Sequence, residues 1–392
     1  MSVPGVDSAG PWAPGSVMAK RPAPSSAGAM ERPRARAKIR VGTDFSGLDI
    51  VVNVLKDVCL NVQHIFSSDA DPKVRKYLAH NHAPKTVYED VRSRNVADME
   101  PVDLYAFGPP CQSFSSAGRR QGSSDDRGKL FAFSLDYIQF HKPSMVVFEN
   151  VSKIQQHKDV MVLLTGTLES NGYAVHSKVL NTMSYGCPQH RERFYLVALL
   201  GVVLTHHFDF PAEVPSGIPF STLVPKLPNG QWQHLPISSR KSPETSEKIT
   251  KIVATEVGKV AEKGINPFVR PVCIDTGNSE KWMHHSVDHA MTLTRTHCQS
   301  FSHWCTTKGA FLTVHDYMRL QGLDPCSIDY EGAGLSSRDV AGMLGNCMSG
   351  NVLEFLLPRV LHAAGFISDR KIKSFEARTR AKWGSNGTAS SS

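Results

Sequence analysis

From residue 38 onward, segments with a strand-like pattern of apolar residues alternate with segments that have a helix-like pattern. Residues 38–42 and 62–69 are short runs of the kind that form buried strands. Residues 50–58 and 72–81 instead repeat apolar positions every three or four residues, which predicts helices. Strands that alternate with helices are typical of βαβ units. The pattern therefore predicts an α/β fold with a mostly parallel sheet.

This alternation continues along the chain and then stops. Strands are predicted over 87–91, 103–107, 145–148 and 173–181, with a further one that contains Arg191 and Arg193, and a helix is predicted over 130–140. Between Phe208 and Trp304 the chain is rich in Pro, Ser, His and Lys with scattered aromatic residues, and no regular alternation is visible. The change in pattern sets this region apart from the α/β part.

A cysteine follows one of these strands at a place suited to chemistry. Gly108, Pro109 and Pro110 stop the strand over 103–107 and exclude a helix, and Cys111 comes directly after them. Ligands bind at the carboxyl ends of strands in open α/β sheets, so Cys111 is a candidate nucleophile. The alternative is an inert buried thiol, the usual state of a lone cysteine.

Charged groups from two other strands are candidates for the same rim. Glu149 ends the apolar strand over 145–148. Arg191 and Arg193 lie two residues apart, so they point to the same face of a strand. Two guanidiniums suit an oxygen-rich or anionic ligand, although a solvated strand edge is the alternative. The polar segment 118–128 is too long for a simple connection, which makes it a candidate lid.

The first two strands carry a weaker nucleotide-binding signal. The first leads into a turn at Gly47, and the second ends at Asp69. In nucleotide-binding βαβ folds an acid about 20 residues after the glycine turn accepts hydrogen bonds from ribose hydroxyls. Gly47 stands without the full glycine pattern, so a plain turn is an equal alternative, and Asp69 could instead cap the helix over 72–81.

Composition narrows the class of protein. Of the 392 residues 41% are hydrophobic, yet no uninterrupted apolar run approaches the length of about 18 that spans a bilayer, so we expect no membrane contact. The 8 cysteines show no spacing typical of zinc sites or disulfide frameworks, so no metal is predicted and a reducing compartment fits. The net charge of +8 comes from the two ends of the chain, and the span between them is close to neutral.

Both ends are expected to lack a packed structure. Residues 1–37 predict a disordered basic tail and residues 368–392 a basic flexible tail, because neither offers an apolar face to bury. The first tail is interpreted as a nuclear address, with an organelle transit peptide or a solubilising arm as alternatives.

From about residue 38 to 365 the chain resembles the cytosine-5 DNA methyltransferases, in the compact form seen in bacterial modification systems. The motifs that carry the resemblance are Phe45-Ser46-Gly47, Asp69, Asp90-Val91, Pro109-Pro110-Cys111-Gln112, Arg127 to Phe131, Glu149-Asn150-Val151, Gln189 with Arg191 and Arg193, Arg319 to Gly322, Gly345-Asn346 and Asn351-Val352. Each motif is weak alone, but together they occur in the family's order.

The resemblance implies a mechanism and a fold. The fold would be a Rossmann-like methyltransferase sheet with a small, mostly irregular or β, target-recognition domain. Cys111 would add as a thiolate to carbon 6 of cytosine, because carbon 5 alone is too weak a nucleophile. Glu149 would bind the ring N3 and the exocyclic amine, Arg193 would bind O2, and Arg191 would order the pocket. The target base would be flipped out of double-stranded DNA.

The methyl donor implied by the resemblance is S-adenosylmethionine. Asp69 would bind its ribose and Asp90 would lie near the adenine amine. The full set of implied cofactor residues is Phe45, Ser46, Gly47, Leu48, Asp69, Asp90, Val91, Pro109, Leu130 and Asn346. Four departures from the family's usual motifs are expected to lower cofactor affinity more than they affect the chemistry. Asp49-Ile50 replaces glycines, and Thr43 stands in place of the usual acid, with Asp44 beside it. Ala70 replaces an aromatic residue, and Cys347 replaces a common serine after Gly345-Asn346.

The resemblance also implies a domain order. A catalytic domain over 38–207 and 305–367 would enclose a target-recognition domain over 208–304. Candidates for DNA contacts in that domain are Arg240, Lys241, Arg270, Lys281 and Arg295, although phosphate contacts by themselves carry no sequence information. We expect a monomer.

Two other functions stay open at this stage. A tRNA-modifying branch of the family has a similar size and the same nucleophile loop, so RNA is an alternative substrate. That branch usually carries Cys-Phe-Thr in the recognition region, whereas this chain has Cys298-Gln299-Ser300 and Cys305-Thr306-Thr307. A catalytically silent nucleic-acid-binding protein is the second alternative, and the intact Cys111 and Glu149 argue against it.

Overall fold

The computed structural model describes residues 38–58, 61–110, 130–214, 216–226, 243–277 and 284–384. The predicted tail over 1–37, Cys111 and the candidate lid over 118–128 lie outside these ranges.

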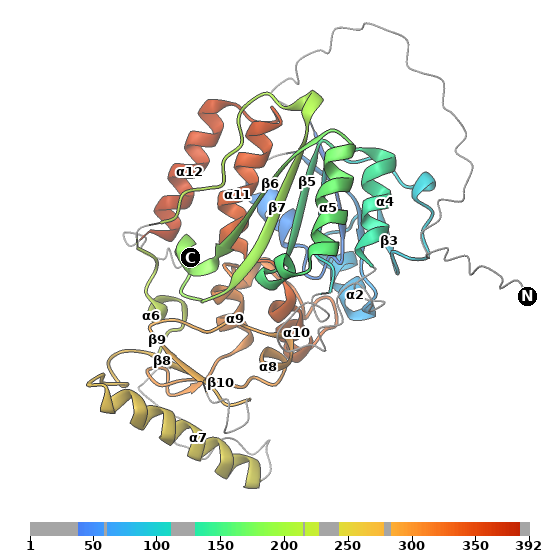
Figure 1. The fold of residues 1–392 in the computed structure, drawn as a ribbon. Helices are drawn as coiled ribbons and strands as arrows, with labels where there is room; N and C mark the ends of the chain where they lie inside the picture. The colour runs from blue at the N-terminus through green and yellow to red at the C-terminus, as the bar shows by residue number, and fades with distance from the viewer. Residues whose placement is uncertain are drawn as a thin grey trace, which may run out of the picture. The chain divides into compact units, whose positions relative to one another are not determined.

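A seven-stranded sheet forms the centre of the described chain (Figure 1). Its strands are β1 (Ile39–Asp44), β2 (Val62–Ser68), β3 (Thr86–Tyr88), β4 (Leu104–Phe107), β5 (Met145–Val151), β6 (Tyr173–Asn181) and β7 (Glu192–Leu200). They lie in the order β3-β2-β1-β4-β5-β7-β6. Strands β1 to β5 pair in parallel, and β7 pairs antiparallel with both β5 and β6. The predicted α/β fold with a mostly parallel sheet is confirmed.

Successive strand residues face two separate cores. In β4, Leu104 and Ala106 belong to one core, whereas Tyr105 and Phe107 belong to the other. This is the alternation of a strand buried on both faces. Helices α1 (Ile50–Asp57), α2 (Pro72–Asn81), α9 (Val314–Leu320), α10 (Ser337–Asn346) and α11 (Gly350–Ala363) pack against the first core, and α4 (Phe131–His141) and α5 (Lys158–Ser170) against the second. Figure 1 shows α4 and α5 together on one face of the sheet.

Short elements connect these parts. The 3-10 helices are Val96–Asp98, Ser152–Gln156, Thr182–Tyr185, Gly201–Val203 and Pro325–Ser327, and a four-residue helix, α6, spans Phe220–Leu223. Within the described ranges no single helix is both long and apolar enough to cross a membrane; α10 and α11 reach that length only together, across a 50° bend.

A second, antiparallel sheet lies in the region predicted to be mostly irregular or β. It consists of β8 (Val272–Asp275), β9 (His284–Val287), β10 (His303–Cys305) and β11 (Ala310–Phe311), in the order β11-β10-β8-β9, and the short helix α8 (Arg295–Gln299) lies between β9 and β10. The expectation is wrong for residues 243–262, which form the 20-residue helix α7 (Pro243–Glu262). Its residues Ile249, Ile252 and Val253 pack against Val272 and Trp304. Their spacing of three and four residues was a readable helix signal.

The predicted flexible tail after residue 368 is the other error. Residues 369–383 form helix α12 (Asp369–Trp383), in which Phe375, Thr379 and Trp383 are buried. These three residues are four apart, so they share one face of the helix. The indole Nε1 of Trp383 donates to a carboxylate oxygen of Glu354 on α11 at 2.6 Å. The buried face of α12 is only one residue wide, so the many basic residues of this segment hide it in the composition.

Residues 34–392 group as one compact unit by their contacts, so the division into catalytic and recognition domains stays a prediction.

The packing of α12 gives a direct stability test. Trp383→Ala should lower the free energy of unfolding by about 3–5 kcal/mol, because it opens a cavity and leaves Glu354 without its indole donor. Urea unfolding of the full chain measures the change. Lys373→Ala, at an exposed position on the same helix, should change stability by less than about 0.5 kcal/mol. Equal stability of the Trp383 variant and the wild type would mean that α12 does not pack.

Candidate active site

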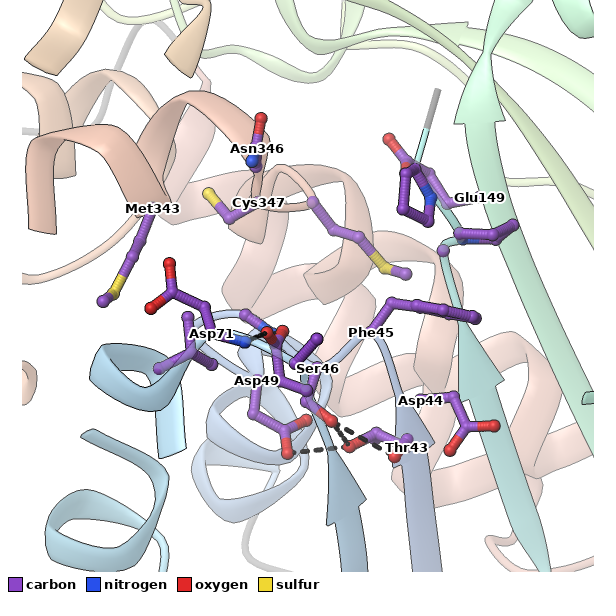
Figure 2. A pocket seen from close by; sticks show the side chains of 18 of the residues that line it. Thr43, Asp44, Phe45, Ser46, Asp49, Asp71, Glu149, Met343, Asn346 and Cys347 are labelled. Carbon is purple, nitrogen blue, oxygen red and sulfur yellow. Dashed lines mark hydrogen bonds between the residues drawn. The ribbon is translucent and has the colours of Figure 1, made fainter. Parts of the chain in front are cut away.

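A cavity of about 530 Å³ opens at the carboxyl ends of the parallel strands. Its walls come from the β1–α1 turn, the ends of β2, β4 and β5, and the far end of α10 (Figure 2). In the sheet, β2 lies on one side of β1 and β4 lies on the other. The cavity therefore lies where the order of the strands reverses direction. Such switch points are the usual ligand sites of open α/β sheets, and the volume is typical of a small-molecule site.

The β1–α1 turn folds back onto the end of β2. Its residues Phe45, Gly47 and Asp49 all have positive φ, at 54°, 53° and 52°. The Gly47 N–H donates to Oδ2 of Asp69 at 3.0 Å, and the Ser68 N–H donates to Oγ of Ser46 at 3.0 Å. Two of the three left-handed residues carry a side chain, which costs free energy that glycine would not. The turn is therefore held by specific hydrogen bonds rather than by a run of glycines.

Asp69 joins this turn to the start of α2. Its second oxygen, Oδ1, accepts from the Asp71 N–H at 2.9 Å. Asp71, not Asp69, is the N-cap of α2, since its side chain accepts from the Lys73 N–H. The alternative that Asp69 caps this helix is therefore wrong. Burial raises the pKa of Asp69 above its ordinary value, although the hydrogen bonds from Asp71 and Gly47 act the other way.

The carboxylate of Asp49 lies beside Thr43, the position at which the sequence lacks an acid. It accepts from Oγ1 of Thr43 at 2.9 Å and from Oγ of Ser67 at 2.8 Å, with Nε2 of His64 at 3.3 Å. Burial alone would raise the pKa of Asp49, but the charge and hydrogen bond of His64 outweigh it and hold the pKa below its ordinary value. The carboxylate of Asp49, the residue before α1, thus lies next to the last residues of β1.

Asp44, the neighbouring acid, has a different role. Its side chain forms a buried ion pair with Arg94 and accepts hydrogen bonds from the hydroxyls of Tyr105 and Ser134. A buried ion pair of this kind is costly to break from one side. Asp44 lines the cavity, but its carboxylate is already used by these structural partners.

The other predicted cofactor residues divide into two groups. Those that line the cavity are Phe45, Ser46, Gly47, Asp69, Asp90, Val91, Pro109, Leu130 and Asn346. Leu48 does not: its side chain is fully buried in the core beside α1, and its carbonyl accepts from Nε2 of His82. The predicted contact of Leu48 with the cofactor therefore stays a prediction. Asp90 already holds Arg92, with Nη2 to Oδ2 at 2.6 Å, and this bond lowers the pKa of Asp90.

Glu149 provides the acidic group on the opposite wall. It stands near the end of β5 and is 7% exposed. Its Oε1 lies 3.3 Å from Nε of Arg193. This oxygen has no hydrogen-bond partner among the residues that the structure describes. Burial raises the pKa of Glu149, and the charges of Arg193 and Arg191 counteract this only in part. A buried oxygen with spare acceptor capacity favours a ligand that brings a donor.

Arg191 and Arg193 both line the cavity but bind different partners. Arg191 is 1% exposed, and its guanidinium donates to the carbonyls of Leu293 at 2.8 Å and Cys347 at 2.7 Å. It therefore fastens the segment before α8 and the α10–α11 link to the rim of the sheet. Arg193, at the start of β7, is the arginine next to Glu149.

The predicted nucleophile, Cys111, lies outside the described residues. The described segment 61–110 ends one residue before it, at Pro110, and both Pro109 and Pro110 line the cavity. The side-chain amide of Asn150 donates to the carbonyl of Pro109 at 3.1 Å, which ties the end of this segment to the residue after Glu149. The chain therefore leaves the described region at the edge of the cavity.

Several cavity residues were not found by sequence reasoning. They are Met343, Met348 and Gln299, which come from the last third of the chain and were not predicted as site residues. Cys347, which follows the motif Gly345-Asn346, also lines the cavity. Arg295, predicted as a DNA contact, also lines the cavity, with Nη2 3.3 Å from Oδ2 of Asp71. Arg270 pairs with Asp288 at the surface, and Arg240, Lys241 and Lys281 lie outside the described residues.

Comparisons with known proteins agree with this geometry. The sequence model of a family described as C-5 cytosine-specific DNA methylase matches residues 45–362. The type II methyltransferase M.NlaX of Neisseria lactamica is 36% identical over 160 residues, which cover 40% of this chain and 50% of that protein. M.HhaI of Haemophilus parahaemolyticus is 28% identical over 187 residues, or 47% of this chain and 56% of that protein. The matched segment thus spans about half the length of these curated relatives.

Solved structures share the fold. The Entamoeba histolytica methyltransferase EhMeth superposes with a TM-score of 0.58 at 16% identity, covering 83% of this chain and 98% of that one. The S. pombe Dnmt2 methyltransferase superposes with a TM-score of 0.53 at 15% identity, again covering 83% and 98%. At this identity the likeness shows the fold alone. The bacterial origin of the sequence relatives gives no support to the predicted nuclear localisation, which stays a prediction.

The Asp49 network predicts an order of stabilities. Asp49→Ala should cost about 3–5 kcal/mol, because it removes the buried carboxylate that accepts from the Thr43 and Ser67 hydroxyls and places alanine at positive φ. Asp49→Gly should cost about 1–2 kcal/mol less than alanine, since glycine adopts this backbone freely. Asp49→Asn should cost least, because it keeps an acceptor oxygen.

Urea unfolding measures this series, with the exposed Lys56→Ala as a control in the same helix. Because folding lowers the pKa of Asp49, its stabilising effect is complete above the pKa of the unfolded chain and is lost as the pH falls through the lower, folded value. The difference between wild type and Asp49→Asn should therefore shrink in acid. Equal stability of the alanine and asparagine variants would contradict the network.

The arrangement around Glu149 predicts a pKa change. Removing the neighbouring cation in Arg193→Ala should raise the pKa of Glu149 further, because desolvation then acts with less opposition. Arg193→Lys should have a smaller effect, since the charge remains. The side-chain carboxyl ¹³C shift against pH measures this, with Glu149→Gln to assign the signal. Lys178→Ala, an exposed cation on β6, is the control and should leave the pKa unchanged. A pKa that falls in Arg193→Ala would contradict the proposed pairing.

Proposed function

The chain belongs to the C-5 cytosine-specific DNA methylase family, and from this premise we propose that it transfers a methyl group to carbon 5 of cytosine in DNA. One observation carries the proposal: the buried Glu149, with a spare acceptor oxygen beside Arg193, faces the same cavity as the β1–α1 turn and Asp69. A base-binding end and a cofactor-binding end therefore share one enclosure.

The chemistry at the base-binding end follows from the polarity of cytosine. A protonated Glu149 donates to N3 while its other oxygen accepts from the exocyclic amine, and the Arg193 guanidinium donates to O2. The raised pKa of Glu149 favours the protonated form that this step uses. Donors and a proton on the ring draw electron density away from carbon 6. The ring then becomes open to attack by a thiolate.

Cys111 is the proposed nucleophile. Its thiolate adds to carbon 6, which forms a carbon–sulfur bond and makes carbon 5 electron-rich. Carbon 5 then takes the methyl group, loses its proton to a base, and the carbon–sulfur bond breaks to release the thiolate. Cys111 follows directly on Pro110 at the edge of the cavity, which supports this role.

S-adenosylmethionine is the proposed methyl donor, and the residues present fit it. The half-buried Asp69 keeps lone pairs beyond those used by Gly47 and Asp71, so it can accept from ribose hydroxyls. Phe45, Val91 and Leu130 offer apolar contacts, and Asp90 offers an acceptor for an amine. When bound, this cofactor supplies the electrophilic methyl group. The residue that departs most from the family's motif, Asp49, is already satisfied by Thr43 and Ser67 and leaves no buried charge unpaired.

The proposed substrate is double-stranded DNA with its target cytosine flipped out, because a cavity enclosed in this way cannot reach a stacked base. The segment 112–128 would close over the flipped base, and residues 208–304 would contact the DNA. The protein would act as a monomer.

Covalent trapping tests the proposal. A duplex that carries 5-fluorocytosine cannot release the enzyme, because fluorine blocks the loss of the carbon 5 proton. With S-adenosylmethionine present, we expect an adduct that survives denaturing electrophoresis. Cys111→Ala should form none, and Glu149→Gln should form it roughly 10²–10⁴-fold more slowly. Cys326→Ser, at an exposed cysteine that does not line the cavity, is the matched control and should trap normally.

The other outcomes separate the alternatives. Trapping on fluorocytosine tRNA but not on DNA would assign the tRNA substrate. Cofactor binding without trapping on either nucleic acid would indicate a silent binding protein. Trapping by Cys111→Ala would show that Cys111 is not the nucleophile.

A further inference from the structure

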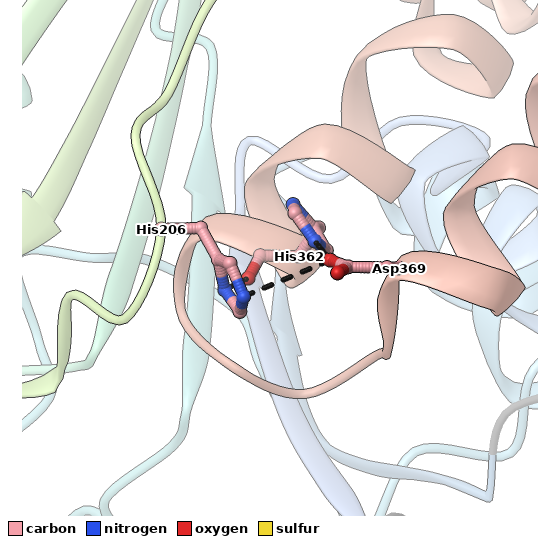
Figure 3. Close-up of side chains that lie close together, drawn as sticks. All are labelled: His206, His362 and Asp369. Carbon is pink, nitrogen blue, oxygen red and sulfur yellow. Dashed lines mark hydrogen bonds and ion pairs between the residues drawn. The ribbon is translucent and has the colours of Figure 1, made fainter.

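Two histidines and an aspartate from three different segments of the chain converge on one another (Figure 3). His206 lies in the segment after β7, His362 in the last turn of α11, and Asp369 at the start of α12. One donor atom from each lies within 4.8 Å of the other two. None of the three belongs to the cavity or to any motif of the family.

The separations suit a small divalent cation. Nε2 of His362 lies 2.6 Å and Nε2 of His206 lies 3.7 Å from the same oxygen, Oδ1 of Asp369. Two donors held 2.0–2.1 Å from a tetrahedral zinc ion are about 3.3 Å apart, which falls between these two values. Small side-chain rotations would therefore place an ion among the three donors.

The histidine rings are oriented for this role. They stack with centroids 4.1 Å apart and planes 27° apart, and both turn Nε2 toward Asp369. Nδ1 of His206 lies 3.1 Å from the carbonyl of His362. A proton on Nδ1 that is donated to a carbonyl leaves Nε2 as the free lone pair, which is the usual arrangement of metal-bound histidine.

The surrounding backbone adds a favourable field. The cluster lies at the carboxyl end of α11, where helix dipoles favour positive charge. The N–H groups of Thr205 and His206 both donate to the Ala363 carbonyl, at 2.9 and 3.2 Å, so the segment that carries His206 is fixed to that helix end. The position of the histidine pair is thus set by the backbone and not only by the ion pair with Asp369.

A second histidine–aspartate cluster differs in an informative way. Asp275, His297 and His303 also lie within reach of one another. There, however, the Asp275 carboxylate already accepts from Ser302, from the Gly277 N–H and from His297, so its oxygens have fewer positions open. In the first cluster Asp369 is 72% exposed and open to solvent on its free side.

We infer that His206, His362 and Asp369 bind a divalent transition-metal ion of the Zn²⁺ class, with water in the remaining position. Binding replaces the proton that Nε2 of His362 shares with Asp369, and that proton passes to solvent. The ion would join the segment after β7, α11 and α12 at one point. Its role would be to hold the C-terminal helix against the fold, and it would take no part in methyl transfer.

Metal titration of the full chain tests this inference. The protein is purified, its affinity tag is removed, and bound metal is stripped with a chelator. Co²⁺ is then added as the spectroscopic probe. We expect one tightly bound ion per chain, with d–d bands of nitrogen and oxygen ligands and no thiolate charge-transfer band. Zn²⁺ should displace it and raise the Tm by a few degrees.

Variants assign the site. Asp369→Asn and His206→Ala, both at exposed side chains, should bind Co²⁺ at least roughly 10-fold more weakly and lose the Zn²⁺-dependent rise in Tm. His207→Ala, the adjacent and more exposed histidine, is the matched control and should bind normally. Because Asp369 is exposed, the unfolding curve of its asparagine variant without metal should match the wild type.

Three results would overturn the inference. The first is the absence of stoichiometric binding. The second is unchanged binding in Asp369→Asn and His206→Ala. The third is binding that His297→Ala abolishes instead, which would assign the ion to the other cluster.

Discussion

A buried guanidinium holds together the parts of the chain that form the cavity. Arg191 is almost fully excluded from solvent, and its two terminal nitrogens donate to the backbone carbonyls of Leu293, Gly345 and Cys347. A buried charge without such partners would be very costly, so the segments that supply the carbonyls must stay in place. They bring the α10–α11 link to the rim of the sheet. Burial raises the pKa of Glu149, and the charge of Arg191 opposes part of this rise, which couples the support of the cavity to its electrostatics.

The cavity also shows how a departure from a motif can be accommodated. Family resemblance predicts an acid at position 43 and a glycine at position 49, and this chain has Thr43 and Asp49. In the structure the Asp49 carboxylate accepts a hydrogen bond from the Thr43 hydroxyl. The carboxylate missing at position 43 is therefore supplied from position 49. The expectation of lower cofactor affinity considered each position by itself. The hydrogen bonds to Thr43 and Ser67 offset part of the cost of a side chain at positive φ.

Much of the fold could be predicted from the sequence, because strands buried on both faces and amphipathic helices have clear periods. The errors have physical reasons. In α12, Phe375, Thr379 and Trp383 form a narrow apolar stripe among basic residues, and the composition hides it. The group of His206, His362 and Asp369 has no local signal, since tertiary packing alone brings these residues together.

The central claim is that one cavity serves a methyl donor and a flipped cytosine. The most direct measurement is mass spectrometry of nucleosides from DNA incubated with the purified chain and S-adenosylmethionine carrying a deuterated methyl group. The account predicts 5-methylcytosine with the labelled methyl in DNA, and none with Cys111→Ala or in the absence of protein. Unlabelled DNA in the presence of bound cofactor, or label found only in tRNA, would contradict it.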